Sequence, residues 1–254
     1  MKRAPGFSAN QGLPAEDGGS REGAGAGRVI EVTESRPDAK EEKENRVSFL
    51  RRLKGLPEDT IKVIDFAYDL GKEAHRTQKR DTGERYFEHL REVALILIDE
   101  CGLKDPDLIS ICLLHDSGED SPIFGNATEA YSKWKETAHF RLSRVFNPEV
   151  AEGVILLTKP KVDGREIGTK EEAHRMYLAG LSSAKLKLVL VKMADRLHNL
   201  RTLSGTTPEK QRRITKETRE VYLPLFQGVL SEYPTEGQHL LDEMEKAMTD
   251  LEVE

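Results

Sequence analysis

Two histidines and two aspartates are the residues of this sequence that could together bind a metal ion. The segment LLHDSGEDSP places His115 and Asp116 directly after an apolar run, whereas His89 and Asp195 lie elsewhere, each among apolar residues. A buried carboxylate is costly unless it is paired or metal-bound, and imidazole with carboxylates suits divalent first-row ions such as Mn²⁺, Fe²⁺ or Zn²⁺. Each residue alone is better explained as a hydrogen-bonded or ion-paired core residue. The set as a whole predicts a metal site built from three helices.

Further polar residues lie close to these four in the sequence. Asn199 and Thr202 follow Asp195 at i+4 and i+7, so the three side chains share one face of an expected helix. Glu119 and Asp120 follow the His-Asp pair after two small residues. They form either a plain acidic loop or a pair that orients a water molecule and takes its proton.

The elements that must position these residues are helical. Hydrophobic periodicity of the helical type runs from Val47 onward and predicts an all-α fold. Residues 1–45 are rich in glycine, serine, alanine and charge and predict a disordered tail, followed by one domain over 46–250. Helices are expected over 58–76, 86–101, 106–116, 127–143, 147–157, 169–181, 183–203, 208–221, 223–231 and 235–249. Loops are expected over 77–85, 117–126 and 159–168.

The composition limits the class of protein. The chain has 254 residues, 33% of them charged, and a formal net charge of -6, which argues against nucleic-acid binding. No apolar run approaches about 18 residues, so no membrane span is expected, and the N-terminus lacks the apolar segment of a secretory signal. Cys101 and Cys112 lie in apolar helical patterns and are expected to be reduced core thiols. We therefore expect a cytoplasmic protein.

A small anionic ligand would need a local basic pocket in this acidic chain. Candidate cations lie in two expected loops and around Asp195, and they are Lys79, Arg80, Lys159, Lys161, Lys192, Arg196 and Arg201. Surface solvation explains any single lysine better than ligand binding does. Arg80 is the strongest candidate, because a planar guanidinium can stack on a purine and donate two hydrogen bonds to a phosphate.

Four spaced segments carry a resemblance to a known family. They are AHRTQKRDTGERYFEHLREVA (74–94), LLHDSGED (113–120), VAEGVILLTK (150–159) and VLVKMADRLHNLRTL (189–203). The order H…HD…D is similar to that of the HD-domain phosphohydrolases, and the segments resemble the hydrolase domain of RelA/SpoT-type alarmone enzymes. The segment KQRRITKETREVYLPLF (210–226) resembles the stretch directly after that domain in the long enzymes, so the resemblance covers 66–226. It implies an all-helical HD bundle of the small, hydrolase-only form.

The resemblance also implies an activity and a set of site residues. The activity is hydrolysis of the 3′-pyrophosphate of (p)ppGpp, which yields GDP or GTP and pyrophosphate, and the metal is usually Mn²⁺. The implied metal ligands are His89, His115, Asp116 and Asp195. The implied acids that activate water are Glu119 and Asp120. The implied substrate-binding residues, which lie near the base, ribose and phosphates, are Arg80, Thr82, Asn199 and Thr202.

Several positions depart from the family pattern. Asp81 stands where the family commonly has lysine, Leu90 where it has proline, and Ser117-Gly118 where it has apolar or β-branched residues. Asp81 favours an alternative, an HD-type hydrolase acting on another phosphorylated nucleotide such as NADPH or a nucleoside phosphate. A non-catalytic nucleotide sensor is a third interpretation, which the complete set of implied ligands and acids disfavours.

The segment after Asp120 is longer than the family leads us to expect. It contains Tyr131 and Trp134. These aromatic residues either line the mouth of the pocket or pack in the core on an added helix, and the second arrangement is expected.

Overall fold

The computed structural model describes residues 44–125 and 129–253. Backbone contacts divide the chain into Met1–Lys43 and Glu44–Glu254, and the described residues belong to the second unit. The predicted tail over 1–45 therefore lies almost wholly outside the described residues and stays a prediction, as does the domain boundary at 46.

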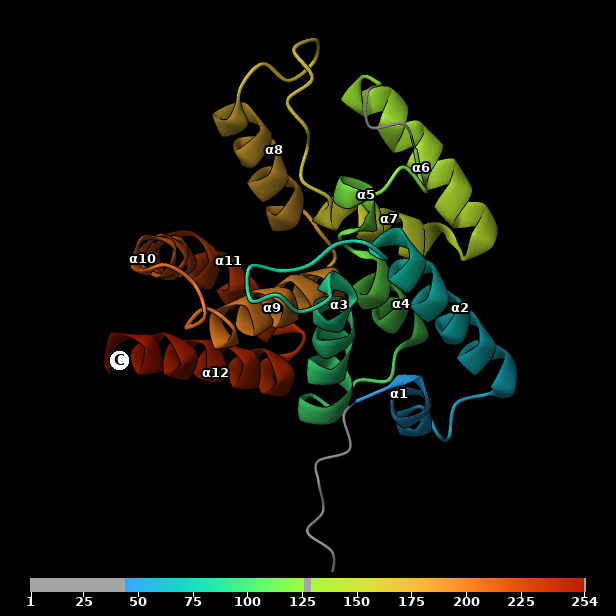
Figure 1. Ribbon diagram of the computed structural model, residues 1–254, viewed down its shortest axis with the longest axis horizontal. Coiled ribbons are helices and arrows are strands. Elements are labelled where there is room, and N and C mark those ends of the chain that lie inside the picture. The colour runs from blue at the N-terminus through green and yellow to red at the C-terminus, as the bar shows by residue number, and fades with distance from the viewer. Residues whose placement is uncertain (1–43, 126–128, 254) are drawn as a thin grey trace, which may run out of the picture. The chain divides into compact units, whose positions relative to one another are not determined.

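The described residues form helices and no strand, which confirms the predicted all-α class (Figure 1). The α-helices are α1 (Arg46–Arg52), α2 (Glu58–Ala74), α3 (Tyr86–Leu95), α4 (Pro106–Leu114), α5 (Ser117–Asp120), α6 (Tyr131–Val145), α7 (Pro148–Leu157), α8 (Lys170–Ser182), α9 (Leu186–Arg201), α10 (Pro208–Glu217), α11 (Leu223–Phe226) and α12 (Pro234–Val253). Single turns of π-helix follow α3 and α10, at Ile96–Glu100 and Thr218–Tyr222, and a 3-10 turn, Gln227–Ser231, follows α11.

Local sequence explains where three of the helices begin. Asp105 accepts hydrogen bonds from the first backbone N–H groups of α4, and Pro106 is its first residue. Asn147 and Thr207 cap α7 and α10 in the same way, and each is also followed by proline. A capping side chain satisfies an otherwise unpaired N–H, and proline at the first position loses no hydrogen bond. These helices therefore start at positions defined by two adjacent residues.

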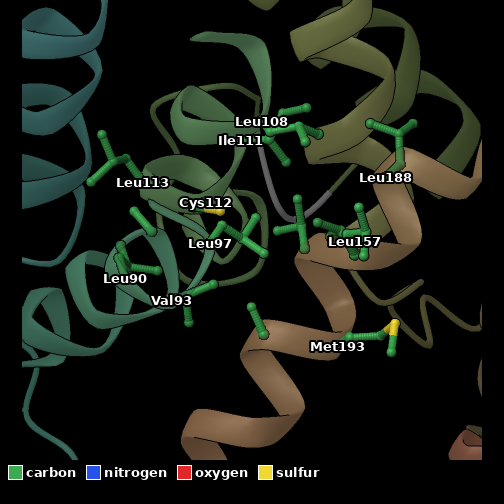
Figure 2. Close-up of a cluster of buried hydrophobic side chains, with 14 of the residues drawn as sticks. Leu90, Val93, Leu97, Leu108, Ile111, Cys112, Leu113, Leu157, Leu188 and Met193 are labelled. Carbon is green, nitrogen blue, oxygen red and sulfur yellow. The ribbon is translucent and has the colours of Figure 1, made fainter. Parts of the chain in front are cut away.

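Three helices, α3, α4 and α9, contact one another and form the centre of the unit. Around them, α2 packs on α4, α7 lies between α4 and α6, and α12 packs along α9 (Figure 1). Figure 2 shows the apolar side chains that meet at this junction, among them Leu90, Val93, Leu113 and Met193. Burying each such leucine stabilises the fold by about 1.5–3 kcal/mol. The ends of α3, α4 and α9 are consequently held in fixed positions relative to one another.

The main differences from the sequence-based expectation are two added short helices and two later helix starts. The expected loop 117–126 contains the short helix α5, because the Ser121 N–H bonds to the Ser117 carbonyl before Pro122 ends the turn. The helix expected over 183–203 begins at Leu186, since Ser183 still bonds to the last turn of α8. The helix expected from residue 127 is described only from Tyr131, and 126–128 lie outside the described residues. Helix α1 was not expected.

Candidate metal centre

The four predicted ligands converge where α3, α4 and α9 meet. His89 lies on α3, His115 follows the last residue of α4, Asp116 caps α5, and Asp195 lies in the middle of α9. Asp195 Oδ1 is 3.1 Å from His89 Nε2 and 3.8 Å from His115 Nε2. Asp116 Oδ2 is 3.3 Å from His115 Nε2 and 3.8 Å from His89 Nε2. Ligand atoms of His89, His115 and Asp116 all lie within 4.8 Å of one another.

Hydrogen bonds at Nδ1 of each imidazole leave the two Nε2 atoms directed at the carboxylates of the two predicted aspartate ligands. His115 Nδ1–H donates to the Cys112 carbonyl at 2.8 Å, and its buried Nε2 has no hydrogen-bond partner among the described residues. Arg80 donates to His198 Nδ1 at 3.0 Å, so this nitrogen is an acceptor. His89 Nδ1, 2.8 Å from the same atom, must therefore carry the proton. Both imidazoles thus keep a proton on Nδ1, and Nε2 is the nitrogen that would bind a metal ion in place of a proton.

Asp195 is held on both carboxylate oxygens. Lys192 Nζ lies 2.6 Å from Oδ2, and Asn199 donates from its amide to Oδ1 at 2.7 Å. The aspartate and the lysine are only 5% and 7% exposed. Burial raises the pKa of Asp195, but the ammonium of Lys192 and the two imidazoles lower it by more, so the carboxyl group is ionised.

The electrostatics of this centre favour a cation. Burial lowers the pKa of His115, yet the carboxylates of Asp116 and Asp195 outweigh burial and raise it to about 10. Burial raises the pKa of Asp116, but His115 and His89 lower it well below the usual range. The two carboxylates therefore attract positive charge to the space between the imidazoles, as a proton or as a metal ion. Two imidazole nitrogens and two carboxylates fit a divalent first-row ion.

A cavity of about 370 Å³ is lined by three of the predicted ligands, His89, Asp116 and Asp195, and by all the predicted substrate-binding residues. The latter are Arg80, Thr82, Asn199 and Thr202. Asn199 also connects two parts of the site, because its Oδ1 accepts from Arg80 at 2.6 Å while its amide group donates to Asp195. The Thr202 hydroxyl donates within its own helix, to the His198 carbonyl at 3.0 Å, and can still accept a hydrogen bond.

A tight turn presents Arg80 to the cavity. Arg80 N–H donates to the Glu84 carbonyl, and the Gly83 N–H donates to the Arg80 carbonyl, each at 2.9 Å. Gly83 has a φ of 86°, a backbone conformation that glycine adopts without steric cost. The turn directs the guanidinium towards His198 and Asn199 of α9.

Of the two predicted catalytic acids, the structure describes the side chain of one. Glu119 lines the cavity, and its Oε1 accepts a hydrogen bond from the backbone N–H of Lys159 at 2.7 Å. Burial, and then the negative charge of Asp116, raise the pKa of Glu119. Asp120 ends α5, and its side chain lies outside the described residues. The roles of both acids stay predictions.

The predicted cations divide into two groups. Lys79, Arg80, Lys159, Lys192 and Arg196 line the cavity. Arg201 does not, because it forms ion pairs with Glu100 at 2.5 Å and Glu243 at 2.7 Å on α12. Lys161 donates to the Glu119 carbonyl at 2.5 Å instead of lining the cavity. Five of the seven predicted cations therefore line the cavity, whereas Arg201 stabilises the contact between helices through its ion pairs.

The sequence pattern did not indicate His198, Tyr86 or Lys210. His198 accepts hydrogen bonds from His89 and Arg80, and Tyr86 donates to Asp116 Oδ2 at 2.7 Å. Each lies one helical turn from a ligand, three residues after Asp195 or three before His89, and this spacing could have identified both. Lys210 reaches the cavity from α10 and pairs with Asp81 at 2.5 Å, a contact that no local spacing reveals.

Comparison with known proteins connects this geometry to characterised relatives. The chain is 36% identical to the bifunctional (p)ppGpp synthase/hydrolase SpoT of Escherichia coli strain K12 over 174 residues, which are 67% of this chain and 22% of that protein. It is 39% identical to a probable guanosine-3′,5′-bis(diphosphate) 3′-pyrophosphohydrolase of Synechocystis over 160 residues, 63% of this chain and 19% of that protein. The chain thus spans about a fifth of the length of these relatives.

A solved structure shares the fold. It is described as a metazoan ortholog of SpoT that hydrolyzes ppGpp, with a TM-score of 0.55, 21% sequence identity, and coverage of 75% of this chain and 97% of that one. None of the helices in the described part of the chain is sufficiently long and apolar to cross a membrane. The sequence model of the HD domain matches residues 67–228, a span that contains all four predicted ligands. The chain belongs to the HD domain family.

Proposed function

We propose that this protein hydrolyses the 3′-pyrophosphate of (p)ppGpp, releasing pyrophosphate and GDP or GTP. The observation that carries the proposal is the convergence of the His89, His115, Asp116 and Asp195 ligand atoms beside a cavity lined by arginine and lysine. The relatives named as (p)ppGpp hydrolases support the choice of substrate. Mn²⁺ is the proposed ion, because two imidazoles and two carboxylates suit a first-row divalent cation.

Each residue has a separate task in this proposal. A bound divalent ion supplies Lewis acidity towards a phosphoryl oxygen and lowers the pKa of water. Glu119 accepts the proton of the attacking water, and its raised pKa makes it a stronger base than an exposed glutamate. The Lys159 backbone N–H fixes one oxygen of this carboxylate, so the other can face the cavity. The water oxygen bonds to phosphorus as the bond from phosphorus to the ribose 3′ oxygen breaks, and that oxygen leaves as a hydroxyl group with a proton returned from Glu119 or from solvent.

Arg80 and its partners bind the nucleotide. The guanidinium is anchored on one side by His198 and Asn199, which leaves its face available to stack on a purine. Lysine and arginine side chains outnumber the carboxylates that line the cavity, within a chain whose net charge is -6. A local excess of positive charge raises the local concentration of an anionic ligand.

One observation favours a second substrate class. Asp81 stands at the cavity, and its ion pair with Lys210 occupies a cation that could otherwise meet a phosphate. A nucleotide with fewer phosphates near Asp81, such as NADPH or a nucleoside phosphate, would lose less binding affinity from the pairing of Lys210 with Asp81. The substrate test therefore needs a panel.

The experiment is a turnover assay of the full chain with ppGpp, pppGpp, NADPH and nucleoside phosphates, each with Mn²⁺, Mg²⁺ or Zn²⁺. Pyrophosphate release from ppGpp with Mn²⁺ is expected, and a chelator should stop it. Asp195→Asn should reduce kcat by at least about 100-fold, whereas Asp242→Asn, the same change on the exposed face of α12, should not. Cleavage of another nucleotide alone would contradict the substrate, and full turnover by Asp195→Asn would contradict the site.

A further inference from the structure

Helix α6 packs directly on the short segment that carries Glu119. Its Trp134 is 5% exposed, and the indole ring lies against the backbone of α5. A Cβ atom on Gly118 would lie 3.0 Å from Trp134 Cζ2 and 2.4 Å from Thr158 Oγ1. A Cβ atom on Gly125 would lie 2.8 Å from Trp134 Cδ1. The glycine at 118 is therefore required by close packing, because the Thr158 side chain occupies the space that a side chain there would need and the indole, which also packs on Gly125, closes the same space.

The loop 158–168 ties the start of α6 to the same segment. Asp163 accepts a hydrogen bond from the Tyr131 N–H at 2.9 Å, and Glu166 accepts from the Ser132 N–H at 2.7 Å. At its other end, the loop holds Glu119 through the Lys159 N–H and the Lys161 ammonium. Asp163 is itself fixed by three N–H groups of the loop, and these bonds lower its pKa well below the usual range.

Trp134 lies outside the cavity beside the predicted ligands. It does not line the main cavity, whereas Glu119 and Lys159 do. The indole stacks on Tyr131, with ring centroids 5.7 Å apart and planes inclined by 17°. Any effect of Trp134 on a reaction in the cavity must therefore pass through α5 or through the loop 158–168, which both hold Glu119.

We propose that α6 is a positioning element for the reaction, and that Trp134 fixes Glu119 in place through its contact with Gly118. The inference rests on the proposed function, since it assigns Glu119 the task of taking the proton from water. A misplacement of about 1 Å at a reacting group can cost about 100-fold in rate. Loss of the indole should accordingly lower kcat rather than raise KM, because the residues that bind the nucleotide come from other elements.

The first test compares two truncations of the same buried helix face. Trp134→Leu should lower kcat about 10- to 100-fold with less than about a twofold change in KM. Leu142→Ala, equally buried on α6 but two turns further along, should lower the melting temperature and leave kcat unchanged below it. Trp134→Phe keeps most of the buried volume but loses the ring atoms that touch Gly118, so it should fold and still lose several-fold in kcat.

The second test asks whether the loss passes through Glu119. Glu119→Gln should lower kcat about 100- to 10,000-fold. In that background Trp134→Leu should add less than about a twofold further loss, because residues acting as a unit are not additive. Independent, multiplying losses would overturn the proposal.

The third test needs no activity and therefore separates this inference from the proposed function. In Trp134→Leu the amide hydrogens of Lys159 and Ser121 should exchange about tenfold faster than in the native chain, and in Leu142→Ala they should not. If the native protein cleaves no alarmone, the proposed function fails and hydrogen exchange still decides the positioning role. Equal exchange in the two variants would overturn that role.

Discussion

At the scale of single residues, the candidate metal centre contains side chains that orient the predicted ligands as well as the predicted ligands themselves. Asp195 is bound on one oxygen by Lys192 and on the other by Asn199, and His89 is oriented by His198. Such outer partners fix the tautomer and direction of a ligand before an ion arrives. Residue type and motif order predicted the four ligands, but they could not reveal these partners, because a pairing depends on which side chains the folded helices bring together.

Lys192→Met is predicted to destabilise the metal-free protein. Burial lowers the pKa of Lys192, but Asp195 raises it by more, so the pair is ionised in the native state. Removing one member of a buried pair leaves the other uncompensated, which costs about 3–5 kcal/mol. Urea unfolding measures the change, and Lys185→Met, which removes an exposed pair with Glu152, should cost less than about 1 kcal/mol. Similar losses in both variants would show that the buried pair is not special.

At the scale of elements, the site requires that α3, α4 and α9 keep their relative positions. Helix α12 supports this arrangement by packing along α9, where Arg201 pairs with Glu100 and Glu243. Arg201 lies two residues after Asn199 in the same motif, which made it look like a ligand-binding cation. Its neighbour on α12 comes from more than 40 positions away in the sequence, so the sequence alone could not indicate the correct role.

The stability of the native protein at low pH is predicted to depend on Arg201. Burial raises the pKa of Glu100, but the Arg201 guanidinium and His239 lower it by more. The hydrogen bond from Arg201 also lowers the pKa of Glu243. The unfolded chain then binds more protons than the native one below about pH 4.5, so native stability falls as the pH falls through that range. The native protein should lose unfolding free energy between pH 7 and pH 3.5, and Arg201→Gln should lose roughly 1 kcal/mol less over the same change of pH. Parallel losses in both proteins would contradict this.

At the scale of the whole molecule, the all-α class could be predicted from hydrophobic periodicity, because any helix that buries one face shows a 3.6-residue repeat in its sequence. The convergence of His89, His115 and Asp195 could be anticipated only from the order of their motifs. The short helix α5 could not be anticipated, since its glycine is a poor helix former and the side chains packed against it, Trp134 and Thr158, are distant in the sequence. The start of α9 shifted because Ser183 completes α8, a competition that periodicity does not register.

A bound ion is predicted to stabilise the entire domain. The ligands come from three helices, so an ion binds the folded chain and not the unfolded one. At about 100 times its dissociation constant, an ion adds about 2.7 kcal/mol, which for a domain of this size raises the melting temperature by roughly 5–10 °C. Scanning calorimetry with Mn²⁺ and with a chelator measures the shift, and His115→Gln should show little of it. An equal shift in this variant would place the ion elsewhere.

The position of Trp134 has a spectroscopic consequence. The sequence contains one tryptophan, and its indole ring lies against the backbone of Gly118, one residue before Glu119. All indole fluorescence of the protein therefore originates from a single known place beside α5. A change in emission on adding a paramagnetic ion or a nucleotide would be an optical signal from that segment, obtained without attaching any label.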